Sequence, residues 1–388
     1  MTFRMSEQQS EIRESILRIC ARFDDEYWLE RDSKGGFPHD LHLAMAQGGW
    51  LGIAMPEEVG GAGLGITEAT VMMQAIAESG GGASAASAIH MNIFGLNPVV
   101  KFGSAEQKAR MLKPLIEGRE KACFAVTEPT TGLDTTKLRT MAVKKGDHYV
   151  VHGQKVWIST AQVADKMLLL ARTTPLADVE KPTEGLSLFY TDLDRRFVDV
   201  REIEKMGRKA VDSNEVFIDG LPIPANHLIG EEGQGFRQIL HGLNPERILV
   251  AGECIGIARN AITRAAGYAK ERSVFGRPIG QNQGVQHPLA KAWAKVEAAN
   301  LMVMHAAELY DSQLSCGVEA NAAKLLAAEA AVEATQVAQL TFGGFGYAKE
   351  YHVERLVREA LLFHIVPVTP HMLMSFIAEK ALGLPKSY

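Results

Sequence analysis

A carboxylate and a guanidinium stand side by side, directly after a proline, in the stretch GLNPERILVAGE at residues 242–253. A glutamate in such a place can act as a general base, because a positioned carboxylate can take a proton from a substrate. Asn244 can cap a helix and Pro245 suits the first helical position, which predicts that Glu246 lies in the first turn. There the helix dipole favours the ionised carboxylate, whereas burial disfavours it. Glutamate is also common in first turns without any function, so these residues alone leave both readings open.

The composition excludes several classes of protein. The chain has 388 residues, 46% of them hydrophobic and 22% charged, which is typical of a globular protein with two or three packed units. Its net charge of −5 gives no electrostatic reason to expect nucleic-acid binding. The apolar runs are too short to cross a membrane, and residues 1–20 lack the apolar segment of a signal peptide, so we expect a cytoplasmic protein. The four cysteines lie far apart without a CxxC pair, which indicates neither a metal site nor a disulfide framework.

The elements that must position Glu246 begin with helices in the first third of the chain. Residues 6–23 predict an amphipathic helix with Ser6 as N-cap. A glycine-rich loop opens into a helix near Thr67, and residues 83–103 predict one further apolar helix. Residues 104–118 begin with a capping pattern and predict another helix.

Near residue 120 the hydrophobic period changes to that of strands. Residues 138–159 predict a hairpin around a KKGD turn, and short strands follow within residues 165–173, 186–193 and 214–224. After residue 236 the helical period returns, first as a long apolar stripe and then as an alanine-rich helix over 319–340. The stripe consists of Leu289, Ala292, Trp293, Val296, Asn300, Val303, Ala307 and Tyr310.

This order predicts an α+β fold rather than a chain of alternating strands and helices. The predicted units are an N-terminal helical domain over 1–120, a small β-barrel-like middle domain over 121–235, and a C-terminal four-helix-bundle domain over 236–388.

Four motifs resemble those of the acyl-CoA dehydrogenases, flavoproteins that desaturate acyl-CoA thioesters. They occur in the family's order over nearly the whole chain, and four ordered motifs are far more specific than any one of them. The motifs are FAVTEPTTGLD at 124–134, GQKVWIST at 153–160, YAKERSVFGRPIGQNQGVQ at 268–286 and GGFGYAKEYHVERLVREA at 343–360.

The resemblance implies that FAD is the cofactor and that two motifs hold its flavin ring. Hydroxyl groups of Thr127 and Ser159 can donate hydrogen bonds to the ring edge, and Trp157 can stack on the ring. Phe124 and Val126 belong to the same implied contacts. Without the resemblance, the preferred interpretation of Trp157 and Phe124 would be that they are inward-facing residues of a sheet core.

The resemblance also implies that a second set of residues reaches the diphosphate and adenylate of FAD in a neighbouring subunit. This set includes Arg272, Phe275 and Gln283, and a guanidinium can grip phosphate oxygens with two hydrogen bonds. Gly343 and Gly344 would let the backbone approach the adenylate closely, or would simply end a helix. Arg272 alone could equally complement a helix dipole. A shared cofactor implies a homo-oligomer, in this family usually a tetramer built as a dimer of dimers.

Many family members carry the catalytic glutamate before the last helix. In the matching stretch here, FHIVPVTPH at 363–371, that position is Pro367, which cannot act as a base. A minority, including the isovaleryl- and long-chain-acyl-CoA dehydrogenases, place the glutamate in an L-x-x-E-R segment, and LNPER fits that pattern. The resemblance therefore implies that Glu246 is the base and that Asn244 and Arg247 contact the CoA nucleotide.

Four positions around the implied site depart from the family pattern or match it. Leu133 replaces a serine that touches flavin and substrate. Pro367 lacks the N–H that holds the thioester oxygen, and such a donor can be worth roughly 3 kcal/mol of barrier. Thr369 matches a threonine near the flavin, and His371 stands where glutamine is usual, so both are predicted cofactor contacts.

Three functions remain open at this point. The leading hypothesis is an FAD-dependent acyl-CoA dehydrogenase that passes its electrons to an electron-transfer flavoprotein. A second is another acyl-CoA reaction on the same scaffold, of desulfinase or oxidase type. A third is a non-catalytic binding relative, which predicts that no acyl-CoA bleaches a bound flavin.

Overall fold

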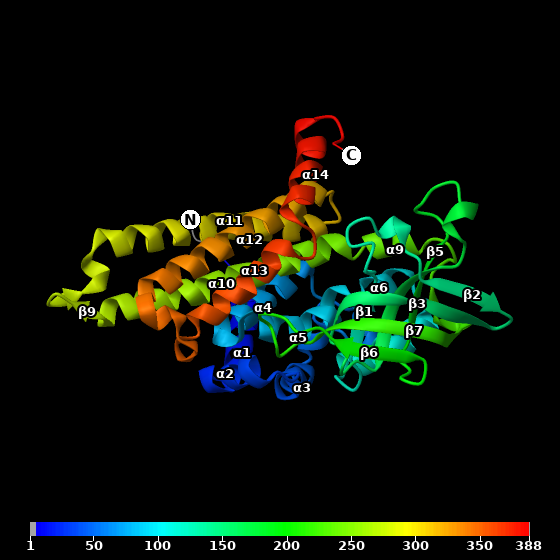
Figure 1. Cartoon of the computed structure of the whole chain (residues 1–388), viewed down its shortest axis with the longest axis horizontal. Helices are drawn as coiled ribbons and strands as arrows, with labels where there is room; N and C mark the ends of the chain where they lie inside the picture. The colour runs from blue at the N-terminus through cyan, green and yellow to red at the C-terminus, as the bar shows by residue number, and fades with distance from the viewer. Residues whose placement is uncertain (1–4, 388) are drawn as a thin grey trace.

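The computed structural model describes residues 5–387, apart from the side chains of Asn92 and Phe94. An elongated helical body carries the β domain at one end, and the C-terminal helix projects from the body (Figure 1). The predicted α+β class is confirmed, with helices before and after a single main sheet.

The N-terminal helices form the lower part of the body in Figure 1. Ser6 and Gln9 make the capping box that starts the first helix, and Ser104 and Gln107 make another, as the capping patterns predict. The single helix predicted over 83–103 is wrong, because the chain turns after Gly95 and Pro98 cannot continue the preceding hydrogen-bond ladder. The helices are α1 (Glu7–Cys20), α2 (Asp25–Lys34), α3 (His39–Gln47), α4 (Ile66–Ile76), α5 (Gly82–Phe94), α6 (Asn97–Phe102), α7 (Ala105–Met111) and α8 (Lys113–Ile116).

Eight strands form one sheet in the order β6-β7-β3-β2-β4-β5-β8, with β1 parallel to β4. The predicted hairpin is confirmed as β2 and β3, and the other three predicted strands are β4, β5 and β7. Strands β1, β6 and β8 lie outside the predicted set, because they are too short to show a clear period. The strands are β1 (Ala122–Ala125), β2 (Met141–Lys145), β3 (His148–Ser159), β4 (Lys166–Arg172), β5 (Leu186–Asp192), β6 (Val198–Glu202), β7 (Ser213–Pro224) and β8 (Leu228–Ile229).

Strand β4 is buried on both faces. Leu168 and Leu170 pack with residues of α6, α7 and α8, while Met167 and Leu169 pack inside the β domain. This explains why the sequence of β4 is a continuous apolar run rather than an alternating one.

The C-terminal body is built around α10, whose 29 residues span about 43 Å. It packs against α11, α12 and α4, and runs from the β domain to the opposite end of the molecule (Figure 1). The predicted stripe on α11 is largely buried, but the assignment of Trp293 to it is wrong. Trp293 is 55% exposed, because the buried line runs through its neighbour Ala292 instead. The elements are α9 (Gly235–Leu240), α10 (Leu243–Glu271), β9 (Ser273–Val274), β10 (Arg277–Pro278), α11 (Gln283–Asp311), α12 (Gly317–Phe342), α13 (Val353–Ile365) and α14 (Pro370–Leu382).

Carboxylates of the C-terminal helices cap two N-terminal helices. Asp311 accepts hydrogen bonds from the backbone N–H groups of Ile66 and Thr67, each at 2.8 Å, at the start of α4. Glu359 accepts from Ala83 N and Ser84 Oγ, each at 2.7 Å, at the start of α5. The two helical parts also share one hydrophobic core, so α5 has a fixed position beside α10.

Within residues 5–387, no single helix is long and apolar enough to span a membrane. The bent pair α13 and α14 meets that length and composition test only when both helices are taken together.

Candidate active site

Glu246 lies in the first turn of α10, as predicted. The predicted capping is wrong: the helix already begins at Leu243, because α9 leads into it through only two residues, and Asn244 is therefore not its N-cap. Pro245 accordingly falls beyond the first helical position. The amide oxygen of Asn244 instead accepts a hydrogen bond from Arg247 Nη1 at 3.1 Å. The two predicted CoA contacts thus lie together on the same turn as the candidate base.

Glu246 is partly exposed, yet its surroundings strongly disfavour the ionised form. Burial raises the pKa of Glu246 to about 7, opposed by the charges of His90 and Arg247 and assisted by that of Glu253. A carboxyl with this pKa is about half ionised at neutral pH, which suits proton abstraction near that pH.

Glu253 extends the same face of α10. It follows Glu246 by seven residues, which places it two turns and about 10.5 Å further along the helix axis. Its side chain is 1% exposed, and its Oε1 lies 2.6 Å from Nδ1 of His90 on α5. The face of α10 that carries Glu246 is therefore turned toward α5.

Arg208 connects α5, which lies against this face of α10, to the β domain. It lies in the loop between β6 and β7 with φ of 54°, a left-handed conformation that is unusual for arginine. Its Nη1 donates to Ser87 Oγ of α5 at 3.3 Å, and its Nη2 donates to Ser159 Oγ and Ser213 Oγ at 3.0 Å each. We call Ser87, His90, Arg208 and Glu253 the polar array.

The sequence predicts none of the polar array. Its members are separated by up to about 170 positions and form no local motif, so nothing in the sequence links them. Only the packing of α5, α10 and one β-domain loop brings them together.

The side chain of Trp157 is exposed rather than packed into the core of the sheet. It is 59% exposed, has φ of 62°, and lies where the β3–β7 pairing shifts register between Lys155 and Ile158. Its reading as an inward-facing sheet residue is therefore wrong. For Phe124 that reading holds in part, because its ring is half-buried against two hydrophobic clusters. Val126 is buried beside it.

A buried lysine of β3 ties this strand, which carries Trp157, to the loop after β1, which carries Thr127. Lys155 Nζ donates to Val126 O and Glu128 Oε1, each at 3.0 Å, and to Leu170 O at 2.8 Å. Burial lowers the pKa of Lys155 to about 8, opposed by the charge of Glu128. Next to this pair, Val156 N donates to Thr127 O at 3.0 Å.

We call Thr127, Trp157 and Ser159 the inner flavin face. It combines an exposed indole with two hydroxyl groups, and the Ser159 oxygen that accepts from Arg208 keeps its own hydrogen to donate. A flat aromatic surface edged by donors fits a flavin ring, which needs a stacking partner and hydrogen bonds at its edge.

The segment before α14 is anchored from α12. Lys324, which is fully buried, donates from Nζ to Val368 O at 2.9 Å, next to Pro367. Burial lowers the pKa of Lys324 to about 8, and the nearby charge of Arg247 lowers it further. Thr369 is half-buried just before α14, whereas His371 is exposed. Leu133, in the loop after β1, is 52% exposed.

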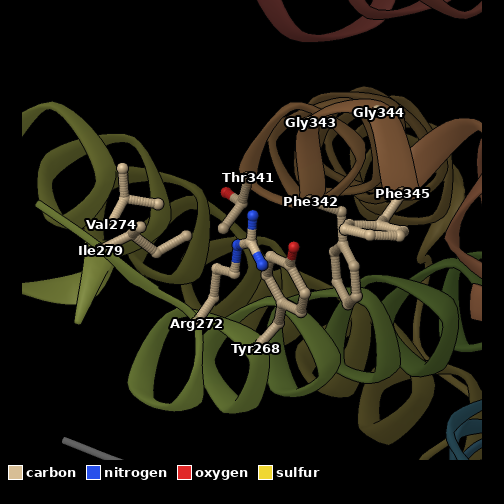
Figure 2. Close-up of a pocket in the computed structure, with 9 residues that line it drawn as sticks. All are labelled: Tyr268, Arg272, Val274, Ile279, Thr341, Phe342, Gly343, Gly344 and Phe345. Atoms are coloured by element: carbon tan, nitrogen blue, oxygen red, sulfur yellow. The ribbon is translucent and has the colours of Figure 1, made fainter.

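The other predicted cofactor residues lie at the far end of the bundle. Arg272, Gly343 and Gly344 line a pocket of about 470 Å³ (Figure 2). The Arg272 guanidinium lies 5.7 Å from the ring centre of Phe345, also in the pocket. The remaining lining residues are Tyr268, Val274, Ile279, Thr341 and Phe342.

Phe275 and Gln283 are exposed near this pocket, and the ring of Phe275 is entirely free of protein contact. Gly343 has φ of 60° directly after α12, so its helix-ending role holds. A Cβ added at Gly343 or Gly344 would meet open space. We call Arg272, Phe275, Gln283, Gly343 and Gly344 the bundle tip.

The inner flavin face and the bundle tip are far apart in one chain. Glu246 and Arg272 are 26 residues apart, with α10 running between them, which corresponds to about 39 Å. They lie at opposite ends of α10, which runs from the β domain to the far end of the body (Figure 1). The bundle tip therefore lies far from the β domain, which carries the inner flavin face.

Comparisons with known proteins agree along the whole chain. Family models for the acyl-CoA dehydrogenase N-terminal, middle and C-terminal domains match residues 6–119, 123–221 and 233–382. Acyl-CoA dehydrogenase FadE12 of Mycobacterium tuberculosis is 34% identical over 402 residues, covering 100% of this chain and 99% of the relative. The CarC subunit of the caffeyl-CoA reductase-Etf complex of Acetobacterium woodii is 35% identical over 337 residues, covering 87% of this chain and 88% of the relative. The solved structure of butyryl-CoA dehydrogenase from Megasphaera elsdenii superposes with a TM-score of 0.93 at 28% identity, covering 98% of this chain and 100% of that one.

Proposed function

This chain belongs to the acyl-CoA dehydrogenase family, an FAD-dependent family of oxidoreductases, and we propose that it desaturates an acyl-CoA thioester between the α and β carbons with Glu246 as the base. The observation that carries this proposal is the carboxyl of Glu246, whose pKa is raised to about 7 at the start of α10.

The proposed chemistry removes one proton and one hydride. The ionised Glu246 carboxylate takes the proton from the α carbon, and the electron pair of that C–H bond forms the double bond. FAD, when bound, accepts the β hydrogen as a hydride. Pro367 offers no acidic or basic group for this task, which leaves the role to Glu246.

The inner flavin face would hold the ring. Trp157 stacks on it, while the hydroxyls of Thr127 and Ser159 donate to its edge. Because Lys155 and Glu128 already join β3 to the loop after β1, little backbone motion is needed when the ring binds. Phe124, Val126, Thr369 and His371 complete this part of the proposed cofactor site.

The bundle tip would hold the diphosphate and adenylate of an FAD that belongs to a neighbouring subunit. The distance of about 39 Å along α10 from Glu246 to Arg272 supports this assignment, because it places the bundle tip at the end of α10 opposite the candidate base. We therefore propose a homo-oligomer, built as a dimer of dimers. Asn244, Arg247 and Leu133 are the proposed substrate contacts.

The electron acceptor we propose is an electron-transfer flavoprotein. Support comes from the relative CarC, which is named as a subunit of a complex with Etf.

Anaerobic titration of the FAD-loaded protein with a panel of acyl-CoA thioesters tests this function. We expect at least one thioester to bleach the flavin band, and Glu246→Gln to keep its FAD while slowing reduction roughly 1,000-fold. Reduction at an undiminished rate in Glu246→Gln would remove this residue from the mechanism. A flavin that no thioester bleaches would favour a non-catalytic relative, and rapid oxygen consumption during turnover would favour an oxidase.

A further inference from the structure

Arg208 carries a positive charge in the proposed active site without a matching carboxylate. Among the described residues, no carboxylate lies within ion-pair distance of its guanidinium, and its Nε has no hydrogen-bond partner. Burial lowers the pKa of Arg208, and the more distant charge of Glu253 is the largest opposing influence. Burying an uncompensated guanidinium is costly, so its presence calls for a reason.

Several other arginines of the helical body have a carboxylate partner, although Arg247 lacks one and bonds to Asn244 instead. Four such pairs are Arg259–Glu297, Arg264–Asp25, Arg355–Glu359 and Arg358–Asp32.

Arg172 also lacks a carboxylate, but its guanidinium donates to four backbone carbonyls, which have nothing to donate in return. The partners of Arg208 are serine hydroxyls instead. A hydroxyl that accepts from arginine can still donate its own hydrogen, so this cluster offers a cation together with free O–H donors. That combination suits an anion.

The position of Arg208 follows from its contacts. Ser159 belongs to the inner flavin face, and Ser87 lies on α5 three residues before His90. The partner of His90 is Glu253, two turns from the candidate base on α10. An acyl group held between Glu246 and the flavin therefore runs along the polar array.

A long alkyl chain does not suit this surrounding. It would take water from the partly exposed guanidinium of Arg208 without replacing its hydrogen bonds. Nδ1 of His90 and Oε1 of Glu253 lie against each other at 2.6 Å, whereas Arg208 has only serine hydroxyls as partners.

We propose that the acyl group bears a terminal carboxylate, so that the substrate is the mono-CoA thioester of a short dicarboxylic acid, and that Arg208 and Ser87 receive this carboxylate. The inference rests on the proposed function and adds the substrate class. The acid is short because the polar array lies within two helical turns of Glu246.

The test compares flavin reduction by glutaryl-CoA, its methyl ester and pentanoyl-CoA under anaerobic conditions in stopped flow. For each thioester the flavin-reduction rate is divided by the dissociation constant. We expect this ratio to be about 100-fold higher for glutaryl-CoA than for either neutral thioester, because a buried polar site strongly rejects an analogue that lacks the carboxylate it binds. Equal values for the charged and neutral thioesters overturn the inference and leave the proposed function intact. If no thioester of either kind reduces the flavin, the proposed function fails as well.

Variants of Arg208 assign the preference to its charge. Arg208→Met should lower the ratio of glutaryl-CoA to pentanoyl-CoA activity about 100-fold, whereas Arg208→Lys, which keeps the charge, should lower it much less. FAD content and the flavin reduction potential are measured for each variant without substrate. A shifted potential with an unchanged ratio would mean that Arg208 serves the cofactor, and would overturn the inference.

Ser87→Ala provides a second variant if Arg208→Met does not retain FAD. It removes one hydroxyl donor from α5 and should lower the same ratio about tenfold, since a hydrogen bond to a charged group is lost. An unchanged ratio in Ser87→Ala counts against the proposed carboxylate site.

Discussion

At the inner flavin face, Trp157 lies on β3 and Thr127 on the loop after β1, and the buried ion pair of Lys155 and Glu128 ties the two together. At the bundle tip, Arg272 is exposed, and the ring of Phe275 touches no other part of the chain. Both regions carry proposed contacts to FAD. One is fixed by its own chain, and the other has groups that only a second molecule can engage.

The difference shows how one fold can divide the binding of a large cofactor. A ring that must accept a hydride needs its surroundings held in place beforehand, because misplacement by a fraction of an ångström slows the reaction. A diphosphate and adenylate need only be retained, and surface groups from a neighbouring subunit can do that. In the proposed homo-oligomer this division would couple FAD binding to assembly, since binding stabilises the associated state.

The largest effect is expected from breaking the buried pair at the inner flavin face. Lys155→Met leaves Glu128 buried without its cation, which should lower the free energy of unfolding by about 3–5 kcal/mol and release most of the FAD. Chemical denaturation and the FAD content of the purified protein measure both effects. The control is Lys144→Met, whose exposed contact with Glu232 at 3.4 Å should matter by less than about 1 kcal/mol. Equal stabilities of the two variants would contradict the proposed stabilising role of the Lys155–Glu128 ion pair.

At the bundle tip we expect a loss of cofactor without a loss of stability. Arg272→Ala should weaken FAD binding roughly 10- to 100-fold, because a charge-assisted hydrogen bond to phosphate is removed, while the free energy of unfolding of the FAD-free protein stays unchanged. Arg277→Ala is the matched control, since Arg277 lies in the same hairpin and bonds to Asn282 of its own chain. FAD retention during dialysis gives the measurement. A fully loaded Arg272→Ala protein would speak for the helix-dipole reading of this arginine.

The pH dependence separates chemistry at Glu246 from cofactor retention. Because the pKa of Glu246 is raised to about 7, its carboxyl is protonated below that pH and cannot accept a proton. The ratio of flavin-reduction rate to substrate dissociation constant should fall about tenfold per pH unit below pH 7 and level off above it. Stopped-flow reduction between pH 5.5 and 8.5 provides the curve. A flat profile over this range would exclude Glu246 as the titrating base.

The smallest effect is expected at the two glycines of the bundle tip. Gly343→Ala should cost about 1–2 kcal/mol of stability from its positive φ alone, because an added Cβ meets no atom within 4 Å. Gly344→Ala has neither strain nor a clash and should leave stability unchanged. Weaker FAD binding in Gly344→Ala would show that a ligand approaches this backbone closely. Unchanged binding would leave only the helix-ending role of Gly343.

Parts of the fold and site follow from local sequence. Ser6 and Ser104 mark helix starts, the KKGD turn marks a hairpin, and both agree with the structure. The LNPER turn places Glu246 in the first helical turn, although its capping differs from the expectation because α9 leads directly into α10. The helix predicted over 83–103 is wrong because a turn interrupts it. The predicted burial of Trp293 is wrong because the buried side of the helix runs through its neighbour Ala292.

The sequence by itself indicated the family, the order of helical, β and helical regions, and the presence of Pro367 where many family members have glutamate, with Glu246 as the predicted base. These depend on residue types and on neighbours within a few positions, where backbone preferences act directly. Only the tertiary structure decided that His90, Arg208 and Glu253 meet beside Ser159, that burial raises the pKa of Glu246 to about 7, and that Arg272 lies at the opposite end of α10. Contacts between distant segments and the loss of water around a charge arise from packing, which no short stretch of sequence contains.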